Sequence, residues 1–183
     1  NPLVPYAFQG VLWYQGEANV NRAEQYKKAF PLMIKDWRTK WNQGNFPFYF
    51  VQLSTFDEFG GNSKKGSKWA ELREAQTYTL QTVANTGMAV TTDIGNAKDI
   101  HPTNKQDVGK RLAAIALNNV YGKKRIYSGP LYKSQEIKGN QIILTFDNIG
   151  SGLSTSDKNG ILKGFEIAGA DKVFHPAKAI IEN

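Results

Sequence analysis

The chain has 183 residues, a formal net charge of +7 and a hydrophobic content of 40%. This content, with four Trp, eight Tyr and ten Phe, argues against disorder, and no apolar run approaches the roughly 20 residues that a membrane-spanning helix needs. The basic residues are dispersed and form no stripe with interleaved aromatic residues, which argues against nucleic acid as a partner. Because the chain has no Cys and only two His, we expect no disulfide framework and no thiolate metal site, and a zinc site has few possible ligands. We expect no cofactor.

The first patterned stretch is an aromatic and β-branched run over residues 8–14, which is typical of a buried strand. Polar and turn-forming residues end it at 15–19. Aromatic and aliphatic side chains then recur at helical spacing from Tyr26 to Trp41, with Asn21 as a candidate cap. The sequence therefore predicts a strand followed by a helix.

Two more pairs of this kind follow along the chain. Residues 46–53 predict a second strand, a long loop occupies the next segment to residue 68, and apolar residues from Trp69 to Val83 predict a second helix. A third strand near residues 88–90 precedes a helix that should begin after Pro102 and Thr103. Strands that alternate with helices predict a mostly parallel sheet covered on both faces, with ligands at the carboxyl ends of its strands.

The character of the sequence changes after residue 126. Residues 131–137 and 141–146 flank a Lys-Gly-Asn turn and predict a hairpin, and 162–167 and 177–181 predict further short strands. We therefore divide the chain into an α/β part at residues 1–126 and a β-rich segment at 127–183. We expect the β region to continue beyond the last residue.

The loop after the third predicted strand contains an Asp-Ile-His-Pro turn. His101 lies there, between a strand and a helix, and Asp99 is close enough in sequence to bind one ring nitrogen and leave the other for a substrate. Asp93, at the end of the strand, is a second candidate acid. The alternative interpretation is a surface hydrogen-bonded pair.

Several segments in order along the chain resemble one family. They are GVLWYQGEAN at residues 10–19, Trp69 with LREAQ at 72–76, DIHP at 99–102 with NK at 104–105 and GKRLA at 109–113, and GFEIAGAD at 164–171. With these motifs the chain resembles the bacterial sialate O-acetylesterases of the SGNH hydrolase superfamily.

The resemblance implies a flavodoxin-like α/β/α esterase domain joined to β-rich parts, which removes acetyl groups from sugar hydroxyls, sialic acid among them, without a metal. It implies a periplasmic or extracellular location. Residue by residue, His101 matches the general base, and Gln15 and Gly16 fall in the block that helps to bind the oxyanion. Glu17 and Asp99 are the two acids able to orient the histidine.

The chain departs from the family pattern at two places. The superfamily commonly places its acid three residues before the histidine, where this chain has Lys98, so the third triad member stays open between Asp99 and Glu17, and a dyad is a further alternative. The Gly-Asp-Ser block with the nucleophile is absent, and we expect it upstream, in the remainder of the polypeptide. Ser54 follows the second strand, but its neighbours form no nucleophile elbow, so we interpret it as a loop residue near the site.

The sequence thus predicts a sialate O-acetylesterase that acts on an acetylated carbohydrate through a serine and a histidine. Two alternatives remain. One is an acetyl xylan esterase or another sugar deacetylase of the same superfamily, because the motifs report acetyl-ester chemistry better than they report the sugar. The other is a carbohydrate-binding protein on the same scaffold without catalytic activity.

Overall fold

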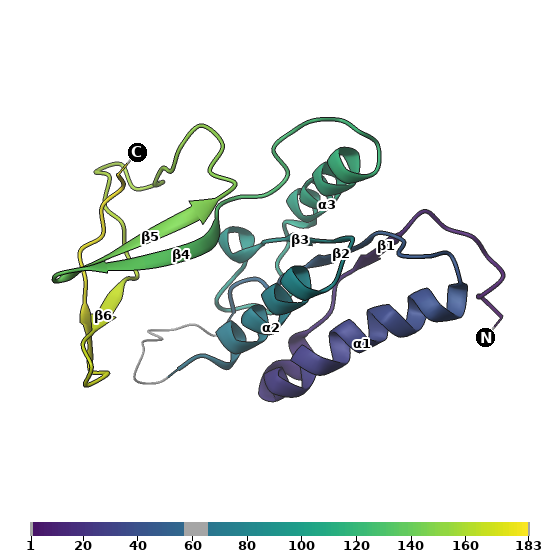
Figure 1. Ribbon diagram of the computed structural model, residues 1–183, viewed down its shortest axis with the longest axis horizontal. Helices are drawn as coiled ribbons and strands as arrows, with labels where there is room; N and C mark the ends of the chain where they lie inside the picture. Colours follow the sequence, from purple (N-terminus) through teal and green to yellow (C-terminus); the bar gives the residue numbers. More distant parts are fainter. Residues whose placement is uncertain (1, 57–65, 183) are drawn as a thin grey trace. The chain divides into compact units, whose positions relative to one another are not determined.

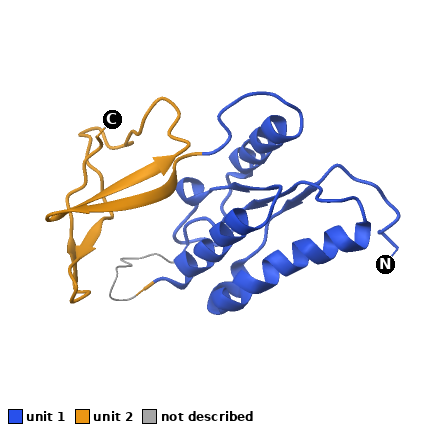
Figure 2. Cartoon of the chain, in the orientation of Figure 1, with its two compact units in different colours: residues 1–60, 67–128 blue, residues 61–66, 129–183 orange. Residues whose placement is uncertain are grey.

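The computed structural model describes residues 2–56 and 66–182 of the chain. They belong to two compact units, Asn1–Gly60 with Ser67–Ser128, and Gly61–Gly66 with Gly129–Asn183 (Figure 2). Much of the long loop expected after the second strand, residues 57–65, lies outside the described residues.

The first unit is built on a three-stranded parallel sheet in the order β1-β2-β3. The strands are β1 (Val11–Trp13), β2 (Phe48–Val51) and β3 (Thr86–Ala89). Every residue of β2 is buried, because the strand is central and covered on both faces, and this explains its continuous apolar sequence. The predicted α/β arrangement with a parallel sheet is confirmed, although β1 is shorter than the apolar run that predicted it.

Three α-helices surround this sheet: α1 (Ala23–Trp41), α2 (Lys68–Thr82) and α3 (Lys105–Asn119). A 3-10 helix, η1 (Glu17–Arg22), contains Asn21, so α1 begins later than that residue predicted. The side chain of Asn104 accepts a hydrogen bond from the backbone N–H of Asp107 and caps α3, which therefore starts after the Pro-Thr pair. Among the described residues, no helix has both the length and the apolar character that crossing a membrane requires.

The helices cover both faces of the sheet (Figure 1). On one face, Phe30 and Ile34 of α1 and Leu72 of α2 form a core with Phe48 and Phe50. On the other face, α3 packs its buried residues against the alternate residues of β2 and β3. Two successive strand-to-strand crossovers that move in the same direction across a sheet place their helices on the same face, as α1 and α2 do here.

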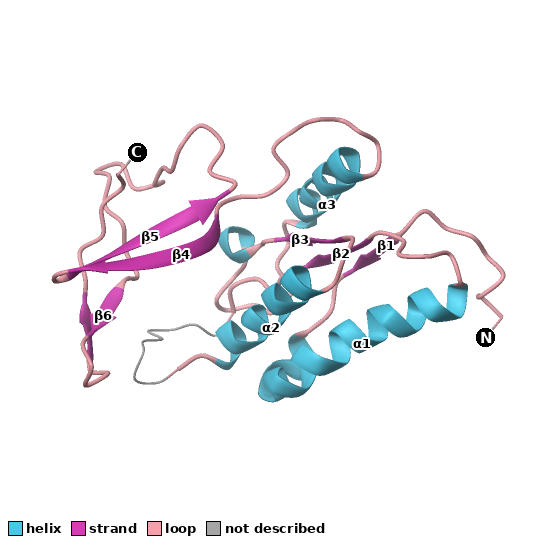
Figure 3. Cartoon of the chain, in the orientation of Figure 1, coloured by secondary structure: helices cyan, strands magenta, loops and turns pink. Residues whose placement is uncertain are grey.

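The second unit contains two small antiparallel hairpins (Figure 3). The first pairs β4 (Leu131–Lys138) with β5 (Gln141–Asp147), as the Lys-Gly-Asn turn predicted. The second pairs β6 (Glu166–Ala168) with β7 (Phe174–Pro176), so the last strand lies before the predicted segment 177–181, where only Ala179 forms an isolated bridge with Leu162. None of the described residues from 129 to 182 is buried.

Candidate active site

The predicted site residues lie on loops that leave the sheet at one edge. Because β1, β2 and β3 are parallel, their carboxyl ends meet there, and the loops that begin at residues 14, 52 and 90 start side by side. The first of these loops carries Gln15, Gly16 and Glu17, and the third carries Asp99 and His101. This edge of the sheet is the candidate active site.

In the loop after β1, the backbone carbonyl of Gln15 is held by two helices. It accepts hydrogen bonds from the Tyr26 hydroxyl of α1 at 3.3 Å and from the Gln76 side-chain amide of α2 at 3.4 Å. The Gln15 side chain is half-buried, and its Nε2 donates to Asn19 Oδ1 at 2.7 Å. The orientation of this residue is therefore fixed at both its backbone and its side chain.

Gly16 is buried and occupies a position that no other residue would fit well. Its φ is 156°, and a Cβ atom would lie 3.0 Å from Leu72 Cδ2 and 3.3 Å from Gln76 Nε2. Within residues 2–56 and 66–182, its backbone N–H has no hydrogen-bond acceptor. A backbone N–H without an acceptor is uncommon in a buried residue.

Glu17 follows as the first residue of η1 and is half-buried. Its charge contributes to the raised pKa of Tyr26, after the larger effect of burial. No hydrogen bond or ion pair joins Glu17 to His101 in the described part of the chain.

In the loop after β3, His101 and Asp99 lie together. Asp99 Oδ1 accepts a hydrogen bond of 2.8 Å from the backbone N–H of His101 and lies 3.6 Å from His101 Nδ1. The imidazole is 88% exposed, whereas the neighbouring Pro102 is buried and anchors the turn. The carboxylate thus faces the Nδ1 side of the ring, and the rest of the ring is accessible.

Asp93, the second candidate acid at this strand end, forms an ion pair with Arg111. Its two carboxylate oxygens accept hydrogen bonds of 2.6 Å from the two terminal nitrogens of Arg111, which also donates to the Val90 carbonyl. The hydrogen bonds from Arg111 lower the pKa of Asp93 below its ordinary value. These hydrogen bonds join the end of β3 to α3, and both carboxylate oxygens of Asp93 are occupied by Arg111.

Close contacts connect the three loops. The Thr55 hydroxyl, after β2, donates to the Thr92 carbonyl at 2.6 Å, and Gly95 lies so near the Thr55 backbone that a Cβ atom would overlap it. Lys105 Nζ, at the start of α3, lies 4.8 Å from the centre of the Tyr14 ring at the end of β1. The segment that follows His101 is therefore held against the strand that leads into Gln15.

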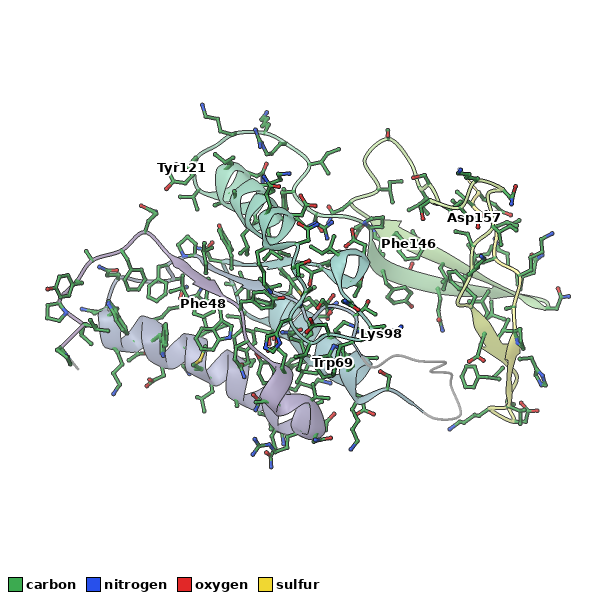
Figure 4. The ribbon with its side chains drawn as sticks, turned by 180° about the vertical axis from the view of Figure 1, so that it is seen from behind. Phe48, Trp69, Lys98, Tyr121, Phe146 and Asp157 are labelled. Atoms are coloured by element: carbon green, nitrogen blue, oxygen red, sulfur yellow. The ribbon has the colours of Figure 1, made fainter. Side chains whose placement is uncertain are left out.

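The loop after β2 contains Ser54, which the sequence left as a loop residue. Ser54 is 6% exposed, and its carbonyl accepts a hydrogen bond of 2.6 Å from the Trp69 indole. Trp69 lies in the first turn of α2 (Figure 4). Among the described residues, no group of three or more His, Asp or Glu side chains is arranged to hold a metal ion.

Sequence reasoning missed Gln76 on α2. Its side chain is fully buried, its Oε1 accepts from the Leu53 N–H at 2.9 Å, and its Nε2 donates to Val51 and Gln15 carbonyls. The available signal was its position: Gln76 falls four residues after Leu72 on the buried stripe of the helix, where an amide needs partners.

Residues 3–118 match the family of carbohydrate esterases described as sialic acid-specific acetylesterases. The chain belongs to this family. The matched segment contains the whole sheet edge, from the loop after β1 to the His101 turn.

Relatives and a solved structure extend this result. The chain is 33% identical over 164 residues to the human sialate O-acetylesterase and 36% identical over 167 residues to the rat sialate O-acetylesterase. These alignments cover 79% and 80% of this chain but 30% of each relative, so the chain spans about a third of their length. A crystal structure of a carbohydrate acetylesterase from Xanthomonas citri superposes with a TM-score of 0.90 at 46% identity, over 99% of this chain and 41% of that one.

Proposed function

We propose that this chain supplies the general base and the oxyanion-binding loop of a serine-type carbohydrate O-acetylesterase that acts on O-acetylated sialic acids. One observation carries the proposal. The exposed ring of His101, with the Asp99 carboxylate 3.6 Å from Nδ1, lies on the same sheet edge as the Gln15–Gly16 loop. Family membership supports the same chemistry.

The reaction begins with a serine from polypeptide outside these 183 residues. His101 Nε2 accepts the serine proton while the serine oxygen attacks the acetyl carbonyl carbon, and it then returns the proton to the sugar oxygen as the ester bond breaks. The same nitrogen then takes a proton from water as the water oxygen attacks the acetyl-serine, and it returns this proton to the serine oxygen as the acyl bond breaks, so that serine is regenerated and acetic acid leaves and ionises to acetate. The histidine ends in its initial protonation state.

The negative charge that develops on the carbonyl oxygen requires hydrogen-bond donors. The Gly16 N–H has no acceptor among the described residues, and Gln15 Nε2 keeps a second hydrogen beside the one that it donates to Asn19. Loss of one such donor raises the barrier of a hydrolase by about 3 kcal/mol. We assign the oxyanion to these two groups.

Of the two candidate acids, Asp99 fits the orienting role better. Its 3.6 Å separation from Nδ1 is longer than a hydrogen bond, but catalytic hydrogen bonds are often long before substrate binds. Glu17 has no polar contact with His101 in the described residues. We therefore assign the orientation of His101 to Asp99 and leave Glu17 outside the triad.

A second carbohydrate is a candidate for the substrate. Mammalian sialate O-acetylesterases are 33–36% identical to the chain, whereas the Xanthomonas carbohydrate acetylesterase is 46% identical. The Xanthomonas protein is described only as a carbohydrate acetylesterase, so another acetylated carbohydrate, such as xylan, is the second candidate substrate.

Acetate release by the full-length protein from O-acetylated sialic acid and from acetylated xylan tests the proposal.

Replacing the base in His101→Ala should lower kcat at least about 100-fold. Asp99→Asn should lower it at least about tenfold, because the ring loses its orienting carboxylate, and Glu17→Gln should change it less than about threefold. The matched control is His175→Ala, because His175 lies in β7 on the second unit and is exposed.

Fluorophosphonate labelling with mass spectrometry identifies the nucleophile. We expect the modified serine to lie outside these 183 residues. Labelling of Ser54 would contradict the assignment, and the absence of labelling in a folded, full-length protein would favour a carbohydrate-binding protein without catalytic activity.

A further inference from the structure

The side chain of Gln76 is fully buried, and both ends of its amide form hydrogen bonds. Oε1 accepts from the Leu53 N–H at 2.9 Å, and Nε2 donates to the Val51 carbonyl at 3.2 Å and to the Gln15 carbonyl at 3.4 Å. One helical side chain thus bridges the carboxyl ends of two neighbouring strands, β1 and β2.

An apolar residue of similar size would fill this volume without needing partners. A buried amide is unfavourable unless its donors and acceptor are paired, and here the pairing directs Nε2 toward Gln15. The bonds to Val51 and Leu53 fix the amide against β2. The third hydrogen bond, from Nε2 to the Gln15 carbonyl, holds the loop after β1 against this fixed amide.

The carbonyl that Gln76 holds belongs to the peptide that joins Gln15 to Gly16. This peptide is trans and planar, so its C=O and N–H point in opposite directions. Because the carbonyl is directed toward Gln76 and Tyr26, on the side of α1 and α2, the Gly16 N–H is directed away from these helices. Fixing the direction of the Gln15 carbonyl therefore fixes the direction of the Gly16 N–H.

We propose that Gln76 is a positioning residue that sets the direction of the Gly16 N–H for the oxyanion. The inference rests on the proposed function for its catalytic part. It assigns Gln76 an effect on the transition state, where the oxyanion exists, and little effect on ground-state binding of the sugar. A purely structural residue would alter stability without this distinction.

Gln76→Met tests the inference, because the side chain keeps its approximate size and loses the amide. The matched control is Thr79→Val, because Thr79 is fully buried on the same face of α2 and, among the described residues, its hydroxyl bonds only within the helix, to the Ala75 carbonyl. Tyr26→Phe is a milder variant that removes the other donor to Gln15 if Gln76→Met does not fold.

Two measurements on the full-length protein are required: steady-state kinetics, and hydrogen–deuterium exchange of residues 14–17. For Gln76→Met we expect kcat to fall about 10- to 100-fold with KM changed less than about threefold, and faster exchange at Gly16. For Thr79→Val we expect kcat within about twofold of wild type and unchanged exchange there, even if the melting temperature falls.

Unchanged exchange at residues 14–17 in Gln76→Met would overturn the inference, and so would faster exchange with an unchanged kcat. If the wild-type protein releases no acetate, the proposed function fails. The exchange measurement then still decides whether Gln76 holds the Gln15–Gly16 peptide, so the two failures are distinguishable.

Discussion

The phenol of Tyr26 lies in the core beside α2, with 5% of its surface exposed, and its hydroxyl donates to the Gln15 carbonyl. Burial raises the pKa of Tyr26 to about 12, and the charge of Glu17 adds to the increase. The hydroxyl therefore stays protonated and able to donate across the pH range in which esterases are assayed.

This shift predicts a loss of stability at alkaline pH. The folded pKa is above the unfolded value of 10, so the stabilisation is complete below pH 10 and is lost as pH rises toward 12. Across that interval the unfolding free energy of wild type should fall by about 2–3 kcal/mol more than that of Tyr26→Phe. Urea denaturation at a series of pH values measures the difference. Equal pH profiles for the two proteins would contradict the prediction, and exposed Tyr6→Phe is the control.

At the scale of residues, local spacing predicted part of the site. Asp99 and His101 are two residues apart, so their association follows from a single turn of the chain. Gln76 and Gln15 are 61 positions apart, and their hydrogen bond depends on the packing of α2 against the sheet. The sequence shows the amide on the buried stripe, but only the fold supplies its partners.

At the scale of elements, Arg38 joins three segments. The buried guanidinium of this α1 residue donates to the Phe46 carbonyl before β2 and to the Ala84 and Asn85 carbonyls after α2. Burial lowers its pKa. Sequence periodicity predicted Trp37 and Trp41 on the buried stripe, yet Arg38 is more deeply buried because backbone carbonyls satisfy its donors.

Replacing this arginine tests how far one side chain holds these elements together. Arg38→Met removes the donor from three carbonyls and should lower the unfolding free energy by about 2–4 kcal/mol. Lys35→Met, an exposed position one turn earlier on α1, should change it by less than about 0.5 kcal/mol. Urea denaturation measures both. If Arg38→Met lowers the unfolding free energy only slightly, water satisfies the three backbone carbonyls as well as the guanidinium does.

At the scale of the whole molecule, burial differs sharply between the two units. All of the buried core residues come from the first unit, and none of the described residues from 129 to 182 is buried. The β4–β5 hairpin pairs Tyr132 with Phe146 and Ile137 with Ile142, and Ile137 is 70% exposed. The sequence predicted this hairpin from its Lys-Gly-Asn turn and the two segments that flank it, but local pattern carries no information on what covers an apolar face.

Two-stranded hairpins without a covered apolar face are marginally stable in water. We therefore expect backbone amides of β4 and β5 to exchange with solvent on the order of 100-fold faster than those of the central strand β2, in the chain of 183 residues. Hydrogen–deuterium exchange with peptide-level mass spectrometry measures this ratio.

A matched pair of substitutions gives the same contrast in stability. Phe50→Ala, at a fully buried β2 residue, should lower the unfolding free energy of the first unit by about 3–5 kcal/mol, because it leaves a cavity. Ile137→Ala, on the exposed hairpin, should change it by less than about 0.5 kcal/mol. Slow exchange in β4 and β5, together with a large effect of Ile137→Ala, would mean that the hairpin is covered in solution and that both units unfold together.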